Sequence, residues 1–128
     1  MTEGMRILLV DDEKRILGIY SGMLEDSGYY VKTSATPENA LRLVSEETFD
    51  IVFLDQFLGA ATGLGLMKQM AVINPELYFV IITANGSADL AVESLKKGAS
   101  DFITKPFFIA DMIKSIEYVN KKRELNRQ

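Results

Sequence analysis

The sequence contains no cysteine and no histidine among its 128 residues. The lack of cysteine excludes disulfides, thiolate nucleophiles and zinc sites built on thiolates. The lack of histidine removes the commonest general base at neutral pH and the commonest metal ligand. Any chemistry that this chain performs must therefore use carboxylates, hydroxyls and lysines.

Long apolar runs and long basic runs are also missing. No apolar stretch reaches the ~18 residues that a bilayer-spanning helix requires, and the amino terminus lacks a charged and then apolar signal pattern. We therefore expect a cytoplasmic protein with no membrane partner. The net charge is −4, from 14 basic and 18 acidic residues, which does not favour a nucleic-acid-binding surface. Direct binding of nucleic acid by this domain is not expected.

What is present is a regular alternation of short apolar runs and stretches with helical spacing, within a hydrophobic content of 48% that suits one domain. The expected strands are Arg6 to Val10, Tyr30 to Ser34, Ile51 to Leu54, Tyr78 to Ile82 and Asp101 to Thr104. The first, third and fourth are apolar on both faces, which indicates central strands, whereas the second has polar positions suited to an edge. Right-handed crossovers then favour an α/β fold: a doubly wound, flavodoxin-like (βα)5 parallel sheet of order 2-1-3-4-5.

The helix boundaries carry signals of their own. Thr36 is expected to cap the second helix with Pro37 at its first position, and Gly28 to end the first helix in a left-handed conformation. The third and fourth helices are expected at Leu64 to Ile73 and Ser87 to Lys97. We place the domain at residues 1–119. Residues 120–128 are polar and basic, which indicates a helix end or the start of a linker.

Three acidic residues follow two of the central strands. Asp11 and Asp12 close the first apolar run, and Asp55 closes the third. Because the carboxyl ends of parallel strands share one crevice, these carboxylates should converge there. Two like charges ~4 Å apart repel by about 4 kcal/mol at an effective dielectric of 20, so the triad implies a bound cation. On spacing alone each acid has a simpler interpretation: a helix cap for Asp12, a turn residue for Asp11, and either for Asp55.

Four motifs at the ends of four strands carry a resemblance. Asp11-Asp12, Asp55, Thr83-Ala84 and Lys105-Pro106-Phe107 resemble the pattern of two-component response-regulator receiver domains, over Met5 to Val119. The family also has the strand order given above. The resemblance implies that Asp55 is the phosphoacceptor and forms an acyl phosphate. It further implies Mg²⁺ held directly by Asp12, Asp55 and the backbone carbonyl of Phe57, with Asp11 acting largely through water.

The same resemblance assigns three further roles. Lys105, expected before a cis proline, would place its ammonium on a phosphoryl oxygen, and the Thr83 hydroxyl would hydrogen-bond the phosphoryl group. Thr83 and Phe102 would act as a switch that couples phosphorylation to the surface of the fourth helix, fifth strand and last helix. From the residues alone, Lys105 is a solvated loop lysine, Thr83 a strand residue and Phe102 a core residue.

The loop after Asp55 departs from the family pattern. The family often has Pro after Met or Leu at this point, but here Gly59 follows Leu58, which should loosen the loop that presents the Phe57 carbonyl. Phe57 and Asn85 occupy variable positions beside the acyl phosphate. Gly63 and Gly65 are expected to serve helix packing and not a phosphate loop, because no Gly-Lys-Ser/Thr follows.

The implied function is phosphorelay signalling. Since the chain has no histidine, the phosphoryl donor would be a sensor histidine kinase or a phosphotransfer protein. The chain would not be an enzyme beyond its own phosphorylation and slow autodephosphorylation. Residues 90–103 look most like receivers attached to ATPase-type transcription activators, which implies a C-terminal effector domain, and the switch surface is a candidate for a phosphorylation-dependent dimer.

Two alternatives stay open at this point. A Mg²⁺-dependent phosphatase with an aspartate nucleophile would want Asp-x-Asp after the first strand and a cap insertion, whereas this chain has adjacent acids and no room for a cap. A flavodoxin-like flavin-binding module would have to receive a phosphate in its first loop, where Asp11, Asp12 and Glu13 would repel it.

Overall fold

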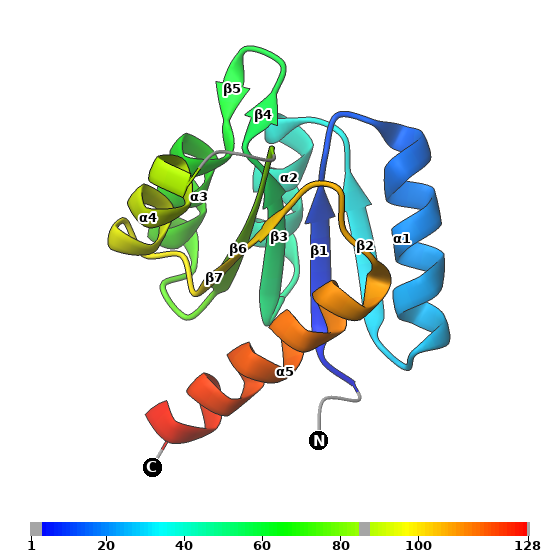
Figure 1. Cartoon of the computed structure of the whole chain (residues 1–128). Coiled ribbons are helices and arrows are strands. Elements are labelled where there is room, and N and C mark those ends of the chain that lie inside the picture. Colours follow the sequence, from blue (N-terminus) through cyan, green and yellow to red (C-terminus); the bar gives the residue numbers. More distant parts are fainter. Residues whose placement is uncertain (1–3, 85–87, 128) are drawn as a thin grey trace.

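A five-stranded parallel sheet forms the centre of the molecule (Figure 1). The computed structural model describes residues 4–84 and 88–127. The sheet consists of β1 (Arg6–Val10), β2 (Tyr30–Ser34), β3 (Ile51–Asp55), β6 (Tyr78–Thr83) and β7 (Asp101–Thr104). Its order is β2-β1-β3-β6-β7, and all neighbours are parallel. Counted as the five long strands, this is the predicted order 2-1-3-4-5, so the predicted fold class is confirmed.

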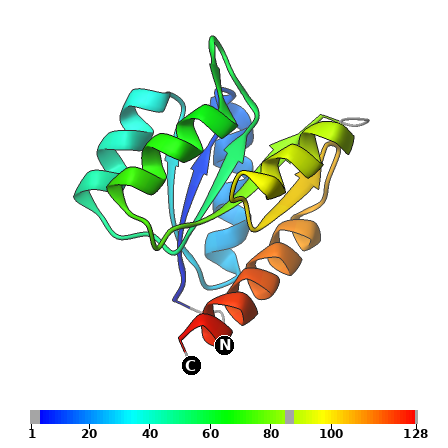
Figure 2. The same ribbon diagram turned by 90° about the vertical axis from the view of Figure 1, so that its left-hand side faces the viewer.

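Helices cover both faces of the sheet (Figure 2). They are α1 (Lys14–Asp26), α2 (Pro37–Glu46), α3 (Gly63–Ile73), α4 (Ala88–Lys96) and α5 (Ile109–Asn126). One core cluster joins the sheet to α1 and α5, and the other joins it to α2 and α3, with α4 packed alongside. No described helix is long and apolar enough to cross a membrane.

The alternation of side chains along the central strands explains the two cores. Within β1, Ile7 and Leu9 point to the α1 and α5 side, while Leu8 and Val10 point to the α2 and α3 side. All of β3 is buried, and each large aliphatic side chain removed from water contributes about 1.5–3 kcal/mol. By contrast, β2 alternates exposed and less exposed positions, as expected of an edge strand.

The predicted helix signals are found at their places. The Thr36 hydroxyl accepts a hydrogen bond from the Asn39 amide at 3.2 Å, and Pro37 is the first residue of α2. Gly28 follows α1 with φ 99°, in the left-handed region. The predicted start of the fourth helix at Ser87 lies outside the described residues, and α4 ends at Lys96, one residue before the predicted end.

A small hairpin between β3 and α3 was not predicted. It consists of β4 (Phe57–Leu58) and β5 (Ala61–Thr62), paired antiparallel, and it stands beyond the carboxyl edge of the sheet (Figure 1). Gly59 lies in its turn with φ 66°, a conformation that a side chain disfavours. Two-residue strands are too short to give a periodic signal in the sequence.

The last turns of α5 contact the opposite, amino-terminal edge of the sheet. Arg123 Nη1 lies 2.7 Å from Asp50 Oδ1, and Asn126 Nδ2 donates to the Tyr78 hydroxyl at 2.9 Å. The described part of the chain begins and ends at this end of the molecule (Figure 1). The predicted domain boundary after residue 119 stays a prediction, and the helix itself continues to Asn126.

Candidate functional site: an acidic crevice at the carboxyl edge of the sheet

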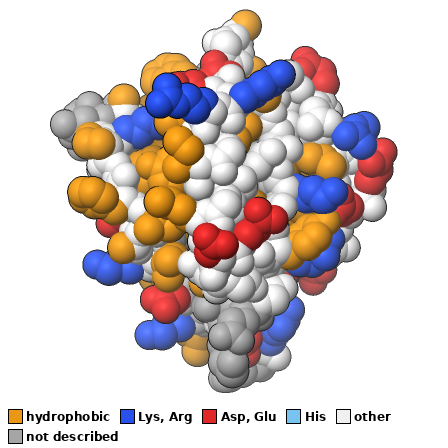
Figure 3. Space-filling view, turned by 90° about the vertical axis from the view of Figure 1, so that its right-hand side faces the viewer, with side chains coloured by type: hydrophobic (Ala, Val, Ile, Leu, Met, Phe, Trp, Pro, Cys, Tyr) orange, Lys and Arg blue, Asp and Glu red, His pale blue; other side chains and the backbone are white. Residues whose placement is uncertain are grey.

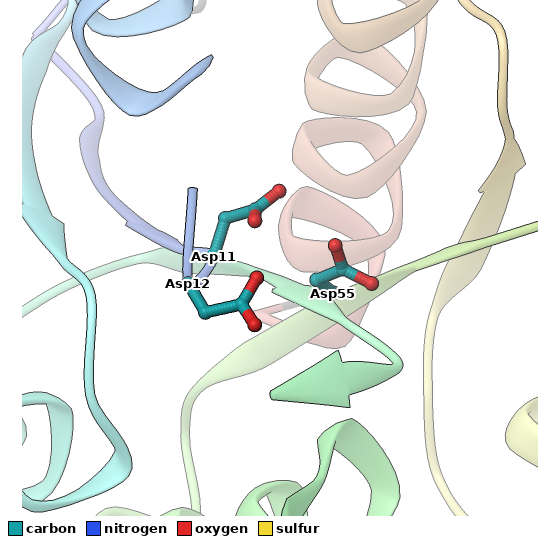
Figure 4. A group of neighbouring side chains, drawn as sticks. All are labelled: Asp11, Asp12 and Asp55. Carbon is teal, nitrogen blue, oxygen red and sulfur yellow. The ribbon is translucent and has the colours of Figure 1, made fainter. Parts of the chain in front are cut away.

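The three acids meet as the strand pattern predicts. Val10 pairs in register with Leu54, so Asp11 and Asp55 follow at the same level on neighbouring strands. Carboxylate oxygens of Asp11, Asp12 and Asp55 lie within 4.8 Å of one another (Figure 4). Asp11 and Asp55 are buried and Asp12 is exposed, so the cluster opens to solvent on the Asp12 side.

Two of these carboxylates, those of Asp11 and Asp55, each use one oxygen to accept a hydrogen bond from a backbone amide in the following turn. Asp11 Oδ1 accepts a hydrogen bond from the Glu13 amide at 3.0 Å, and Asp55 Oδ1 accepts one from the Phe57 amide at 3.1 Å. Asp12 does not cap α1, because Glu13 holds the N-cap position and makes no side-chain cap bond. Asp11 and Asp55 therefore do serve as turn residues, with one oxygen each, whereas Asp12 is not the helix cap that its spacing suggests.

Lys105 lies inside the crevice and is not a solvated loop lysine. Its ammonium nitrogen is 2.7 Å from Asp55 Oδ2 and 3.9 Å from Asp11 Oδ2. Its backbone amide donates to the Thr83 carbonyl at 2.8 Å, which extends the pairing of β6 with β7 and fixes where the side chain begins. The peptide bond between Lys105 and Pro106 is cis, as the resemblance implies.

Burial and crowding of charges change the acidity of this group of residues. Burial, with the charge of Asp55, raises the pKa of Asp11 to about 6, although the Glu13 amide and Lys105 act in the opposite direction. Burial alone would lower the pKa of Lys105, but the hydrogen bond and charge of Asp55, with Asp11 and Glu13 nearby, raise it. The crevice therefore holds a lysine that stays charged and a carboxylate that is costly to ionise without a further cation.

The donor set fits Mg²⁺. It consists only of oxygens, several of them anionic, and a hard divalent ion commonly binds one or two carboxylates together with phosphate. Asp12 is exposed and so lies where an ion could enter from solvent. Phe57, whose carbonyl is the predicted backbone ligand, lies in β4 two residues after Asp55 and is 60% exposed.

Thr83 and Phe102 lie on the adjacent strands. The Thr83 hydroxyl is buried and has no hydrogen-bond partner among the described residues, an arrangement that costs about 1–3 kcal/mol. Phe102 is partly buried, packs against the core and lines a groove of about 430 Å³ between β7 and α5. It is thus both a core residue and the wall of a cavity. Asn85 lies outside the described residues.

Gln56, which was not predicted to belong to this site, lies directly beside it. It is 5% exposed, although it is polar and directly follows Asp55. Its Oε1 accepts a hydrogen bond from the Leu64 amide at 3.3 Å. A glutamine at the end of an apolar strand, seven residues before the start of α3, was the signal available in the sequence.

Comparison with known proteins identifies the family of this arrangement. The family model described as the response regulator receiver domain matches residues 7–117. The alginate biosynthesis transcriptional regulatory protein AlgB of Pseudomonas aeruginosa is 44% identical over 101 residues, which cover 79% of this chain and 22% of AlgB. The nitrogen assimilation regulatory protein NtrX of Azorhizobium caulinodans is 34% identical over 125 residues, which cover 93% of this chain and 28% of NtrX.

Solved structures agree with the sequence relatives. A CheY-like response regulator receiver domain protein from Methanospirillum hungatei superposes with a TM-score of 0.86 at 29% identity, covering 95% of this chain and 98% of that one. NtrX from Brucella abortus in complex with ADP gives a TM-score of 0.90 at 33% identity, covering 97% of this chain and 29% of that one. This chain spans about a quarter of the length of the curated relatives it matches. It belongs to the family of response regulator receiver domains of two-component systems.

Proposed function

We propose that Asp55 accepts a phosphoryl group from the phosphohistidine of a partner kinase or phosphotransfer protein, in a reaction that requires Mg²⁺. The observation that carries this proposal is the contact of 2.7 Å between Lys105 Nζ and Asp55 Oδ2 inside the triad of acids. In this position the buried Asp55 carboxylate can meet an anionic phosphoryl group, which Lys105 would attract, and a Mg²⁺ ion, which the other acids would attract.

The chemistry follows from the groups present. A carboxylate oxygen of Asp55 attacks phosphorus, the phosphorus–nitrogen bond of the donor breaks, and the imidazole leaves. Lys105 then exchanges its contact with the carboxylate for one with a phosphoryl oxygen, which offsets negative charge in the transition state. Asp12, Asp55 and the Phe57 carbonyl would hold Mg²⁺ directly, with Asp11 acting largely through water. When bound, the ion would neutralise phosphoryl oxygens and the crowded carboxylates.

A protein donor suits the surroundings of the crevice. An apolar hollow of about 380 Å³ beside Lys105 is lined by Ile16, Tyr20 and Phe107, among others. Figure 3 shows hydrophobic side chains gathered in a band on the side of the molecule that carries α1. Such a surface favours contact with a partner protein next to the reacting groups.

The phosphoryl group would be read by Thr83 and Phe102. The Thr83 hydroxyl has no hydrogen-bond partner in the described part of the chain, so a new hydrogen bond to the phosphoryl group would favour its movement toward Asp55. The groove that Phe102 lines leaves space for the Phe102 side chain to rotate. The affected surface is that of α4, β7 and α5, which is also the proposed site of a phosphorylation-dependent dimer. Thr83 and Phe102 would thus have two arrangements, and the charge added at Asp55 would shift the balance between them.

The output is proposed from the relatives. AlgB is a transcriptional regulatory protein and NtrX a nitrogen assimilation regulatory protein, and a matched NtrX structure is a complex with ADP. We propose that this receiver acts in the cytoplasm and controls transcription through a C-terminal effector domain of the ATPase type. The domain itself would bind no nucleic acid and catalyse only its own phosphorylation and slow autodephosphorylation. The phosphatase and flavin-binding alternatives are set aside because the family model covers residues 7–117.

The direct test is labelling with acetyl phosphate and MgCl2. Intact mass should show one added phosphoryl group that hydroxylamine removes, and EDTA should prevent its addition. Asp55→Asn should abolish labelling, whereas Asp26→Asn, a change of an exposed acid at the far end of α1, should label as wild type. Labelling that persists in Asp55→Asn and maps to a hydroxyl residue would contradict the assignment.

A further inference from the structure

Gln56 connects the end of β3 to the start of α3. Its backbone amide donates to the Ile82 carbonyl at 2.9 Å, which continues the pairing of β3 with β6 one residue beyond Asp55. This bond fixes the backbone at Gln56, and the side chain is buried. A buried amide must find hydrogen-bond partners or cost stability.

The partner of this side chain is the amino terminus of α3. The first amides of a helix have no partner within the helix. Here the Gly63 amide donates to the Gln56 carbonyl at 2.9 Å and the Leu64 amide to Gln56 Oε1 at 3.3 Å, while Thr62 Oγ1 accepts from Gly65 at 3.1 Å. Gln56 thus serves two of the three amides, and it does so from outside the helix and from the residue next to the nucleophile.

The same contacts close the base of the β4–β5 hairpin. A Cβ at Gly63 would lie 2.6 Å from the Asp55 carbonyl oxygen, so α3 begins against the backbone of the nucleophile. Phe57 pairs in register with Thr62, one residue before that contact. The chain therefore leaves the sheet at Gln56, forms the hairpin, and comes back at Gly63 and Leu64 to contact Gln56 again.

We propose that Gln56 is a positioning residue for the metal. This inference rests on the proposed function, in which the Phe57 carbonyl is a ligand. Gly59 lies in the turn of the hairpin with φ 66°, and glycine restricts the backbone least, so the hairpin cannot rely on a rigid turn. The bond from Gln56 Oε1 to Leu64 N fixes the base of the hairpin instead, and with it the place of the Phe57 carbonyl relative to Asp55. Partners that orient ligands typically change metal affinity by roughly 10–100-fold when they are removed.

The test separates positioning from plain stabilisation. Gln56→Met keeps the length of the side chain but removes the amide oxygen. Thr36→Val is the matched control, because it removes a hydroxyl that accepts a helix amide at 3.2 Å, at the start of α2 on the other side of β1. The measurements are amide NMR shifts of Asp12 and Phe57 during MgCl2 titration, hydrogen exchange at Gly63 and Leu64 without metal, and the metal-free unfolding midpoint.

We expect Gln56→Met to weaken Mg²⁺ binding by roughly tenfold and to speed exchange at Leu64. Thr36→Val should lower the unfolding midpoint and leave the Mg²⁺ affinity unchanged. Gln56→Glu, which keeps an acceptor for Leu64 N, should retain wild-type affinity or tighter. If Gln56→Met does not fold, Gln56→Asn gives the same comparison, because its amide is one methylene too short to reach Leu64.

Wild-type affinity and exchange in the folded Met or Asn variant would overturn this inference and leave the proposed function standing. A wild-type protein without Mg²⁺-dependent shifts at Asp12 would overturn the proposed function, and this inference with it.

Discussion

Lys105 and Asp55, fifty positions apart in the chain, form an ion pair of 2.7 Å at the carboxyl edge of the sheet. The pair joins the end of β7 to the end of β3, with β6 between them. In the proposed reaction this contact must change when Asp55 is phosphorylated, because Lys105 then faces a phosphoryl oxygen and no longer a carboxylate. In that proposal Lys105 would both support the phosphorylation of Asp55 and respond to it.

Propagation of the signal should depend on Lys105 and Thr83. With Mg²⁺ and a beryllofluoride mimic of the phosphoryl group, wild type should show amide NMR shifts near Asp55 and also near Met112 and Ile116 on α5. Lys105→Ala and Thr83→Ala should keep the shifts near Asp55 and lose most of those on α5, because a ligand shifts a two-state equilibrium only through contacts that differ between the states.

Thr48→Ala is the control for these two variants, since Thr48 is an exposed threonine before β3, at the opposite end of the sheet from the crevice. It should respond as wild type does. Full shifts on α5 in both crevice variants would show that Thr83 and Lys105 do not couple the site to that helix.

The stability of the metal-free protein should depend on pH through Asp11. Its pKa is about 6 in the folded protein against 3.8 for an ordinary Asp, so the folded state holds this proton more tightly than the unfolded chain. The stability that the protein gains from holding this proton on Asp11 is therefore fully present below pH 3.8. It is lost as the pH rises through 6. Asp11→Asn, which cannot ionise, should raise the free energy of unfolding at pH 7 by roughly 1–3 kcal/mol.

Urea unfolding in EDTA across this range measures the effect. The difference between Asp11→Asn and wild type should shrink towards acid pH and vanish below the ordinary Asp pKa of 3.8. A difference that stays constant with pH would mean that burial of the Asp11 charge is not its source.

Mg²⁺ should raise the thermal unfolding midpoint through Asp12. An ion that binds only the folded state stabilises it by about 2.7 kcal/mol at one hundred times its Kd. Asp12→Ala should remove this increment and raise the metal-free midpoint, because one repelling carboxylate is gone. Glu25→Ala, a change of an exposed acid near the other end of α1, should respond to Mg²⁺ as wild type does. Equal increments in wild type and Asp12→Ala would place the ion elsewhere.

Substitution by alanine should have opposite effects on stability at two of the glycines, Gly63 and Gly22. Gly63→Ala forces a Cβ to within 2.6 Å of the Asp55 carbonyl oxygen, and overpacking of this kind costs about 1–3 kcal/mol. Gly22→Ala meets nothing within 4 Å inside α1 and should stabilise by about 0.5–1 kcal/mol, since alanine is the better helix former. Thermal unfolding of both variants gives the comparison, and a Gly63→Ala protein as stable as wild type would show that the start of α3 can move away from Asp55.

Much of this molecule could be predicted from the sequence because it depends on short-range patterns. The apolar runs of β1, β3 and β6 and the cap at Thr36 are local, and the parallel connection rules then leave few arrangements. The convergence of Asp11, Asp12 and Asp55 followed from strand order alone. The place of Lys105 came from family resemblance, since nothing in its local sequence distinguishes it from a loop lysine.

What escaped prediction depends on tertiary contact. The β4–β5 hairpin is held by its closed base and not by strand periodicity. The place of Gln56 at the end of an apolar strand could suggest that it is buried, but not that its side chain bonds the Leu64 amide. The contact at Gly63 requires knowing where the Asp55 carbonyl lies. The anchoring of α5 by Arg123 to Asp50 joins residues 73 positions apart and lies beyond the predicted domain boundary.

That anchor gives α5 the geometry of a lever. Its 18 residues make a rod about 27 Å long, whose first turns lie beside β7 and whose last turns are tied to the far edge of the sheet at Asp50. A tilt of about 5° around the tied end would displace the other end of such a rod by about 2 Å. Small rearrangements at Phe102 could thus become side-chain-sized movements on the outer surface, while the point where the chain continues past Arg123 stays almost still.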